Sequence, residues 1–394
     1  AERLVELCAS APSVLGYLRV GGLAAQVLGQ VVGAPADPPL ELLDPARWPD
    51  HPAVVAEPPL HLAAGDRLGP PQRKKTVEAQ PPVAVVEKIA GKVAFYSPAG
   101  ERTNEVKVGT YPHEIIRSLD GKSLYVTDNG ILWMQYAGKG GNTISIIDAA
   151  SRTRTGVIDL GEYRRPHGMA IHPSTGQMVV TIENPDGLLL IDPKERKVIR
   201  KFDVQGKSPH MVLFGPGGNR AYVSNTNSGT VASIEIATGK TKLIPTGKYP
   251  QGGVLSPDGK TIYLTNAESN TITLIDPARD RVVGEIKTST YPNRVTITPD
   301  GRTLVYSLGQ GGDAVGFADT ATRKETGTVA LGGQPLSLTL TKDGRFAFSG
   351  VQSQGKIHVI DVAQRKIIRT IVTPKDAGPD PALPDCRDFS LPAA

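Results

Sequence analysis

The stretch YPHEIIRSLDGKSLYVTDN, residues 111–129, contains the pattern that decides the fold. A proline opens an apolar strand, an Asp-Gly turn follows, and a second apolar strand ends in polar residues. Asp-Gly between two apolar runs indicates a β-hairpin, because glycine accepts the positive φ that a tight turn requires. The pattern returns as RPHGMAIHPSTGQMVVTIEN from residue 165 and as SPHMVLFGPGGNRAYVSNT from residue 208.

The opening proline recurs along most of the chain, at intervals of 41 to 54 residues. Its positions are Pro112, Pro166, Pro209, Pro250, Pro292, Pro335 and Pro379. After each of the first six prolines the sequence predicts four strands, the third of which usually ends in an acidic residue. Four strands in about 40 residues are typical of one blade of a β-propeller.

The two ends of the repeat region complete the ring. VAVVEKIAGKVAFYSPAGERTNEVKVG, residues 83–109, has the pattern of outer strands, and AGPDPALP, residues 377–384, lies where an inner strand should begin. Open blade edges would leave backbone N–H and C=O groups unpaired. We therefore predict an all-β, seven-bladed β-propeller with four-stranded blades over residues 83–384, closed by N- and C-terminal strands that share one blade.

Residues 1–82 share nothing with these repeats. They form a Pro/Ala-rich N-terminal extension, and their prolines interrupt both helices and strands. We expect this extension to be weakly ordered or disordered, or to come from a misassigned start, since it contains no clean signal peptide. Residues 385–394 are expected to be a C-terminal tail.

Composition narrows the classes of function. The net charge is +5, and no Lys/Arg run is long enough for a nucleic-acid arm, so we expect no nucleic-acid partner. No run of about 18 apolar residues predicts a transmembrane segment. Cys8 and Cys386 belong to no CxxCH motif, which excludes covalent c-type haem. The oligomeric state that we expect is a monomer.

The second strands YVTDN, YVSNT and YLTNA, in a period of about 42 residues, resemble the YVTN-type β-propeller repeat family. This family includes YncE-like proteins and surface-layer proteins. The chain is also similar, more distantly, to lactonase-type propellers and to the haem d1 domain of nitrite reductases. The resemblance covers residues 83–384 and is specific for fold; it implies a periplasmic or extracellular location.

The residue after each opening proline should surround one mouth of the ring, where inner strands begin. These ring positions are His113, His167, His210, Gln251, Asn293, Leu336 and Asp380. Closure would place Asp380 beside the three histidines, and His and Asp are common ligands of divalent transition metals. Three interpretations remain open: a metal site at His113, His167, His210 and Asp380, a pocket for a small ligand without metal, or an inert polar lining.

Other residues are expected near the same mouth. Blade 1 contains an insertion, GILWMQYAGKGG at 130–141, whose Trp133 and Tyr136 could cap the mouth or pack against a neighbouring blade. Arg165 and Arg294 flank ring positions and suit carboxylate or phosphate ligands. HPSTG with IEN at 182–184 matches the lactonase-type pattern in one blade only, so Glu183 is expected to serve a turn.

The sequence contains no nucleophile elbow, phosphate loop or HExxH motif, so no motif requires an enzyme. The leading hypothesis is a binding protein that presents its His-lined mouth to a small molecule, a metal ion or a protein partner. The first alternative is a lactone hydrolase or isomerase, in which a metal at the histidines polarises a carbonyl or activates water. The second alternative is a redox protein that resembles the haem d1 domain and uses one histidine as axial ligand.

Overall fold

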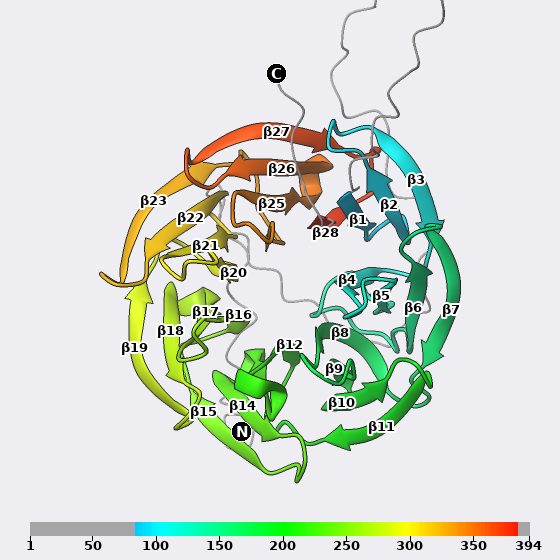
Figure 1. The fold of residues 1–394 in the computed structure, drawn as a ribbon, viewed down its shortest axis with the longest axis horizontal. Coiled ribbons are helices and arrows are strands. Elements are labelled where there is room, and N and C mark those ends of the chain that lie inside the picture. The colour runs from blue at the N-terminus through cyan, green and yellow to red at the C-terminus, as the bar shows by residue number, and fades with distance from the viewer. Residues whose placement is uncertain (1–82, 385–394) are drawn as a thin grey trace, which may run out of the picture. The chain divides into compact units, whose positions relative to one another are not determined.

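The computed structural model describes residues 83–384, and these residues form seven four-stranded antiparallel sheets arranged in a ring (Figure 1). The predictions for residues 1–82 and 385–394 lie outside the described range. Within that range the prediction of a seven-bladed β-propeller is confirmed. No helix among the described residues has the length and apolar character needed to span a bilayer.

The blades follow one another along the chain, and each runs from an inner strand outward. Blade 1 consists of β4 (Pro112–Arg117), β5 (Ser123–Asp128), β6 (Thr143–Asp148) and β7 (Thr153–Asp159). Blade 2 consists of β8 (Arg164–Ile171), β9 (Met178–Asn184), β10 (Asp186–Asp192) and β11 (Lys197–Phe202). Blade 3 consists of β12 (Pro209–Phe214), β13 (Arg220–Asn225), β14 (Thr230–Glu235) and β15 (Thr241–Pro245). Blade 4 consists of β16 (Pro250–Leu255), β17 (Ile262–Asn266), β18 (Thr271–Asp276) and β19 (Arg281–Lys287). Blade 5 consists of β20 (Pro292–Ile297), β21 (Thr303–Leu308), β22 (Ala314–Asp319) and β23 (Lys324–Ala330). Blade 6 consists of β24 (Thr339–Leu340), β25 (Phe346–Val351), β26 (Lys356–Asp361) and β27 (Lys366–Val372). Short 3-10 turns connect some of these strands: η2 (Pro216–Gly218), η3 (Thr226–Ser228), η4 (Ala267–Ser269) and η5 (Gln352–Gln354).

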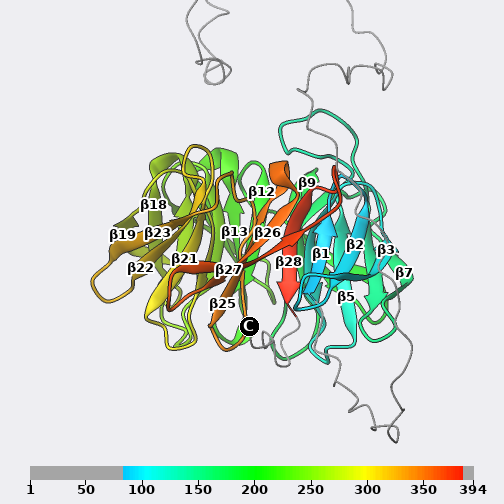
Figure 2. The same ribbon diagram turned by 90° about the horizontal axis from the view of Figure 1, so that it is seen from above.

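Blade 7 joins the two ends of the described chain, as predicted. It consists of β28 (Pro379–Pro384), β1 (Val83–Glu87), β2 (Lys92–Tyr96) and β3 (Arg102–Lys107). The inner strand β28 pairs antiparallel with β1, with Val83 opposite Pro384 and Val85 opposite Ala382. Figures 1 and 2 show β28 beside β1 from two directions. This pairing covers the edge that β1 would otherwise expose.

The hydrophobic core lies between neighbouring blades. One buried cluster, for example, combines Tyr96 of blade 7 with Phe348, Val359 and Ile371 of blade 6. The second and third strands of each blade are buried on both sides, which explains their nearly continuous apolar sequences. The outermost strands consist mainly of exposed or half-buried residues, as expected for a sheet edge that faces solvent.

Hydroxyl groups on the second strands join each of several blades to the next one. Thr127 donates to the backbone oxygen of His167 (3.1 Å), and Thr181 donates to that of His210 (2.7 Å). Ser224 and Thr265 donate in the same way to the ring residues Gln251 and Asn293. The Ser or Thr of the YVTN-like pattern therefore holds the ring residue of the following blade in place.

The start of most inner strands has an unusual backbone. The residue before the opening proline has a positive φ in several blades: Tyr111, Arg165, Ser208, Tyr249, Tyr291 and Gly378. The ladder between the first and second strands then shifts register just after the proline, as between Pro112 and Ile115 and between Pro209 and Val212. Such bulges are common beside functional sites, where they re-aim a side chain. Here each bulge includes the ring position.

Candidate functional site

The ring positions lie together at one end of the inner strands. His113, His167, His210, Gln251, Asn293 and Asp380 are each near the start of an inner strand, whereas Leu336 precedes the short β24. All of them except Asn293 and Leu336 are buried polar residues with exposures of 8% or less. We call this group, together with Lys88, Glu114, Arg165, Glu183 and Arg294, the central cluster. Its role in binding stays a prediction.

The three histidines pack edge to face on consecutive blades. The rings of His113 and His167 have centroids 4.5 Å apart, and those of His167 and His210 are 4.2 Å apart. His113 Nδ1 lies 3.2 Å from His167 Nε2, within hydrogen-bond distance. Burial lowers the pKa of each imidazole well below its ordinary value of 6.5. The histidines are therefore neutral near pH 7.

Glu183 extends this chain of contacts. Its Oε1 lies 3.0 Å from His167 Nδ1, and its Oε2 lies 2.8 Å from Arg165 Nη2. Burial raises the pKa of Glu183 to about 7, although Arg165 and Lys88 oppose the shift. Glu183 lies near the end of β9, opposite Asp186 at the turn into β10, and its side chain has two polar partners in addition.

The insertion at 130–141, which we call the blade-1 loop, contacts the central cluster. It projects from one face of the ring (Figure 2). The backbone oxygen of Ile131 accepts from His113 Nε2 (2.7 Å), and that of Met134 accepts from Arg165 Nη2 (2.6 Å). The Trp133 ring lies 5.5 Å from Lys88 Nζ, a cation–π contact. Tyr136 is 53% exposed.

Two further ion pairs hold the charged side chains of the central cluster. Lys88 Nζ lies 3.4 Å from Asp380 Oδ2, and Arg294 Nη2 lies 2.7 Å from Glu114 Oε1. Burial raises the pKa of Glu114, and Arg294 opposes this shift. Asp380 thus pairs with a lysine contributed by the chain just after β1, on the other side of the closure seam.

Blades 3, 4 and 5 contain polar atoms that are buried without a hydrogen-bond partner of normal geometry in the described part of the chain. Those that belong to the central cluster are His210 Nδ1, Gln251 Nε2, Asn293 Oδ1 and Arg294 Nη1. The nearby Gln251 side chain acts to raise the pKa of His210, against the larger lowering by burial. A buried polar group without a partner costs about 1–3 kcal/mol. These four atoms lie on blades 3 to 5, and we call them the unsatisfied arc. One further atom of the cluster, Arg165 Nε on blade 2, also lacks a partner.

The residues predicted to bind a metal are brought together only in part. Both ring nitrogens of His113 and of His167 have hydrogen-bond partners, and Asp380 pairs with Lys88. Within residues 83–384 no three His, Cys, Asp or Glu side chains are arranged so that they could hold a metal ion. A metal site at these residues therefore stays a prediction.

Sequence reasoning missed several members of the cluster. Lys88 follows the apolar run VAVVE, and Glu114 and Glu183 each lie inside a strand whose other residues are mostly apolar. A charged residue inside a buried strand is itself a signal, because such residues are seldom buried unless they are paired. The backbone oxygens of Ile131 and Met134 had no signal in the sequence.

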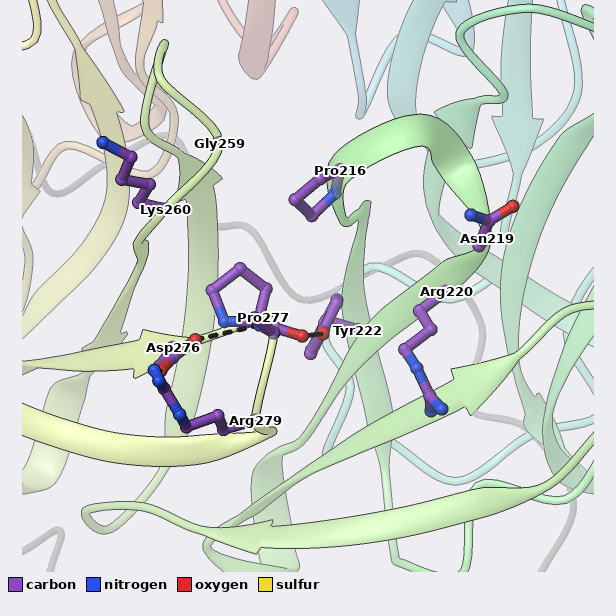
Figure 3. Close-up of a pocket in the computed structure, with 10 residues that line it drawn as sticks. Pro216, Asn219, Arg220, Tyr222, Gly259, Lys260, Asp276, Pro277 and Arg279 are labelled. Carbon is purple, nitrogen blue, oxygen red and sulfur yellow. Dashed lines mark hydrogen bonds and ion pairs between the residues drawn. The ribbon is translucent and has the colours of Figure 1, made fainter.

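A cavity of about 470 Å³ is lined by residues that include Pro216 and Gly259 (Figure 3). Pro216 follows the end of β12 and Gly259 follows the end of β16, whereas the ring positions lie at the starts of these strands. The cavity lining also includes Arg220, Lys260 and Arg279. Arg279 pairs with Asp276 (2.7 Å) and Arg220 approaches Asp280 (3.4 Å), so two of these cations already have carboxylate partners. The cavity therefore offers less unsatisfied polarity than the central cluster.

Comparison with solved structures shows that other proteins share this fold. A functionally unknown protein from Desulfotomaculum acetoxidans DSM 771 is 15% identical, with a TM-score of 0.66 over 77% of this chain and 99% of that one. Hydrazine synthase of Kuenenia stuttgartiensis is 20% identical, with a TM-score of 0.56 over 66% and 86%. Dihydro-heme d1 dehydrogenase NirN, in complex with DHE, is 15% identical, with a TM-score of 0.57 over 78% and 66%. These likenesses concern the fold alone.

Sequence comparison agrees with the repeat analysis. No curated protein matches the chain significantly. Residues 212–310, which run from blade 3 into blade 5, match the model of the YNCE-like beta-propeller family. The resemblance to YncE-like β-propellers is therefore confirmed.

Proposed function

We propose that the central cluster binds a small polar organic molecule. The observation that carries this proposal is the unsatisfied arc formed by His210 Nδ1, Gln251 Nε2, Asn293 Oδ1 and Arg294 Nη1. Convergent polar groups on a rigid ring are the usual means by which a protein orients a small ligand. A ligand that bonds these atoms would remove the free-energy cost of leaving them unpaired.

The arc also indicates the kind of ligand. It offers donors at Gln251 Nε2 and Arg294 Nη1, one acceptor at Asn293 Oδ1, and an imidazole nitrogen that can serve as either. Neighbouring charges are largely balanced, because each of Lys88, Arg165 and Arg294 has a carboxylate partner. A molecule with both carbonyl and hydroxyl groups, such as a sugar, a hydroxy acid or a lactone, suits this set.

The test is a thermal-shift and calorimetric screen with aldoses, hydroxy acids and γ-lactones. A ligand present at about 100 times its Kd would stabilise the protein by about 2.7 kcal/mol. Gln251→Ala and Asn293→Ala should abolish the effect of that ligand, whereas Asn219→Ala, in the lining of the opposite cavity, should leave it unchanged. Binding that survives both arc substitutions would place the site elsewhere, and absence of binding by every class would contradict the proposal.

A second candidate is acid–base chemistry on the same ligand, as in a lactone hydrolase or isomerase. Glu183, with its raised pKa and its contact with His167, is the observation that favours it. Turnover of the bound γ-lactone in the parent and its loss in Glu183→Gln, with binding retained, would support this activity. Binding without turnover would leave a binding protein.

A further inference from the structure

The blade-1 loop is attached to the central cluster by backbone oxygens, which can only accept hydrogen bonds. Ile131 O accepts from His113 Nε2, and Met134 O accepts from Arg165 Nη2. A donor proton must therefore be on His113 Nε2. Because burial keeps His113 neutral, its Nδ1 then carries no proton and must act as an acceptor.

This constraint propagates along the chain of contacts. His113 Nδ1 can accept only if His167 Nε2 donates across the 3.2 Å contact. The one proton of neutral His167 is then on Nε2, so the 3.0 Å contact between His167 Nδ1 and Glu183 Oε1 needs a donor on Glu183. A protonated Glu183 supplies it. The pair therefore holds one proton more than neutral His167 and ionised Glu183 would hold together.

Loss of that proton removes one hydrogen bond from the chain. The chain then has two protons for three contacts, so one contact must lose its hydrogen bond. The three contacts are those of His167 with Glu183, of His113 with His167 and of His113 with Ile131. An ionised Glu183 strongly favours an N–H donor at His167 Nδ1, because hydrogen bonds to a charged acceptor are the stronger ones. The proton on each imidazole consequently moves to the other nitrogen, and His113 Nε2 faces Ile131 O without a proton.

Charged and titratable groups surround the pair from several elements. Arg165 lies on β8, the strand that carries His167. Other inner strands carry His113, His210 and Arg294, and Arg294 is paired with Glu114. Lys88 follows β1, and Asp186 is the first residue of β10. The cations favour the ionised form of Glu183, whereas burial favours its neutral form. These opposing influences make both protonation states accessible near neutral pH.

We propose that Glu183 and His167 form a proton-binding site whose single shared proton latches the blade-1 loop over the central cluster. Proton loss releases the loop at Ile131, where it contacts His113. Only a consequence of this release for ligand binding would rest on the proposed function. The latch itself is a property of the ligand-free protein, so its failure and the failure of ligand binding are distinguishable.

The fluorescence of Trp133 tests the latch. The chain has two tryptophans, so Trp48→Phe leaves Trp133 as the reporter in the loop. In the full-length Trp48→Phe protein without ligand, acrylamide quenching is measured from about pH 5 to about pH 9, on both sides of the range in which histidine and the pair titrate. We expect quenching of Trp133 to rise about twofold as pH increases, as a packed segment opens locally.

Glu183→Gln supplies the decisive comparison. Its amide can donate to His167 Nδ1 at any pH and accept from Arg165, so this variant should show low quenching without a pH transition. Glu114→Gln removes another buried carboxylate of the cluster that does not contact a histidine, and should keep the transition. A parent protein without a transition, or a Glu183→Gln variant that retains it, would overturn the proposal.

An infrared measurement checks the proton directly. The difference spectrum between low and high pH should contain a carboxylic-acid C=O band that disappears in Glu183→Gln and persists in Glu114→Gln. A spectrum identical in the parent and in Glu183→Gln would show that the pair holds no titrating proton. Circular dichroism of each variant establishes that it folds.

Discussion

Glu114 of blade 1 and Arg294 of blade 5 form an ion pair, with Oε1 and Nη2 2.7 Å apart, between residues separated by 180 positions in the sequence. Both residues directly follow a ring position, and both side chains are 14% exposed. The two blades are not neighbours, so this pair joins opposite parts of the ring through its centre. It also orients Arg294, whose Nη1 belongs to the unsatisfied arc.

Breaking this pair should destabilise the ring. Arg294→Ala leaves the carboxylate of Glu114 buried without its partner, and we expect the free energy of unfolding to fall by about 3 kcal/mol. Urea denaturation measures this change. The double variant Glu114→Gln/Arg294→Met, which buries no charge, should lose less. Equal losses in both variants would show that packing rather than charge is responsible.

The raised pKa of Glu183 predicts a specific dependence of stability on pH. This carboxyl binds its proton more tightly in the folded state, so its contribution is complete below the unfolded pKa of 4.5 and is lost as pH rises to about 7. A shift of this size corresponds to about 3 kcal/mol. The histidines act in the opposite direction, but their effect is common to the parent and to Glu183→Gln.

The difference in free energy of unfolding between the parent and Glu183→Gln isolates that contribution. As pH rises from about 4.5 to about 7, the parent should lose up to about 3 kcal/mol of stability relative to Glu183→Gln. Above this range the difference between the two proteins should remain constant. Denaturant titrations at several pH values provide the measurement. A difference that does not vary with pH would mean that Glu183 titrates alike in the folded and unfolded states.

The hydroxyl of Thr181 should matter more than its size suggests. Thr181 Oγ1 accepts from the backbone N–H of Gly168 (2.8 Å) and donates to the backbone oxygen of His210 (2.7 Å). Thr181→Val keeps the shape but leaves both buried groups unpaired, which should cost about 2 kcal/mol or more. Thr328→Val, on the exposed outer strand β23, should change stability by less than about 0.5 kcal/mol. Thermal or urea unfolding compares the two variants.

The closure between β28 and β1 should be indispensable. Ala382 in β28 is 1% exposed and belongs to the core shared by blades 6 and 7. Ala382→Glu buries a charge and disturbs this seam, so we expect a loss of about 3 kcal/mol or more, or failure to fold. Lys366→Glu, on the exposed strand β27, is the matched control and should unfold like the parent. A stable Ala382→Glu protein would mean that the ring closes without β28.

The sequence by itself determined the repeat, the blade count and the closure. Each blade is a local series of hairpins, so the opening prolines and the Asp-Gly turns specify it within about 40 residues. It also identified the ring positions, because equivalent residues in successive blades must occupy equivalent places. His113, His167 and His210 could be grouped for this reason alone.

Only the tertiary structure decided what these residues contact. The pairing of Glu114 with Arg294, of Lys88 with Asp380, and of Glu183 with His167 depends on how side chains turn at the bulges and on where the ring closes. These contacts join residues that no local pattern relates, and burial raises the pKa values of Glu114 and Glu183. The proton chain in particular follows from one backbone oxygen of the blade-1 loop, that of Ile131, whose position is fixed by packing rather than by residue type.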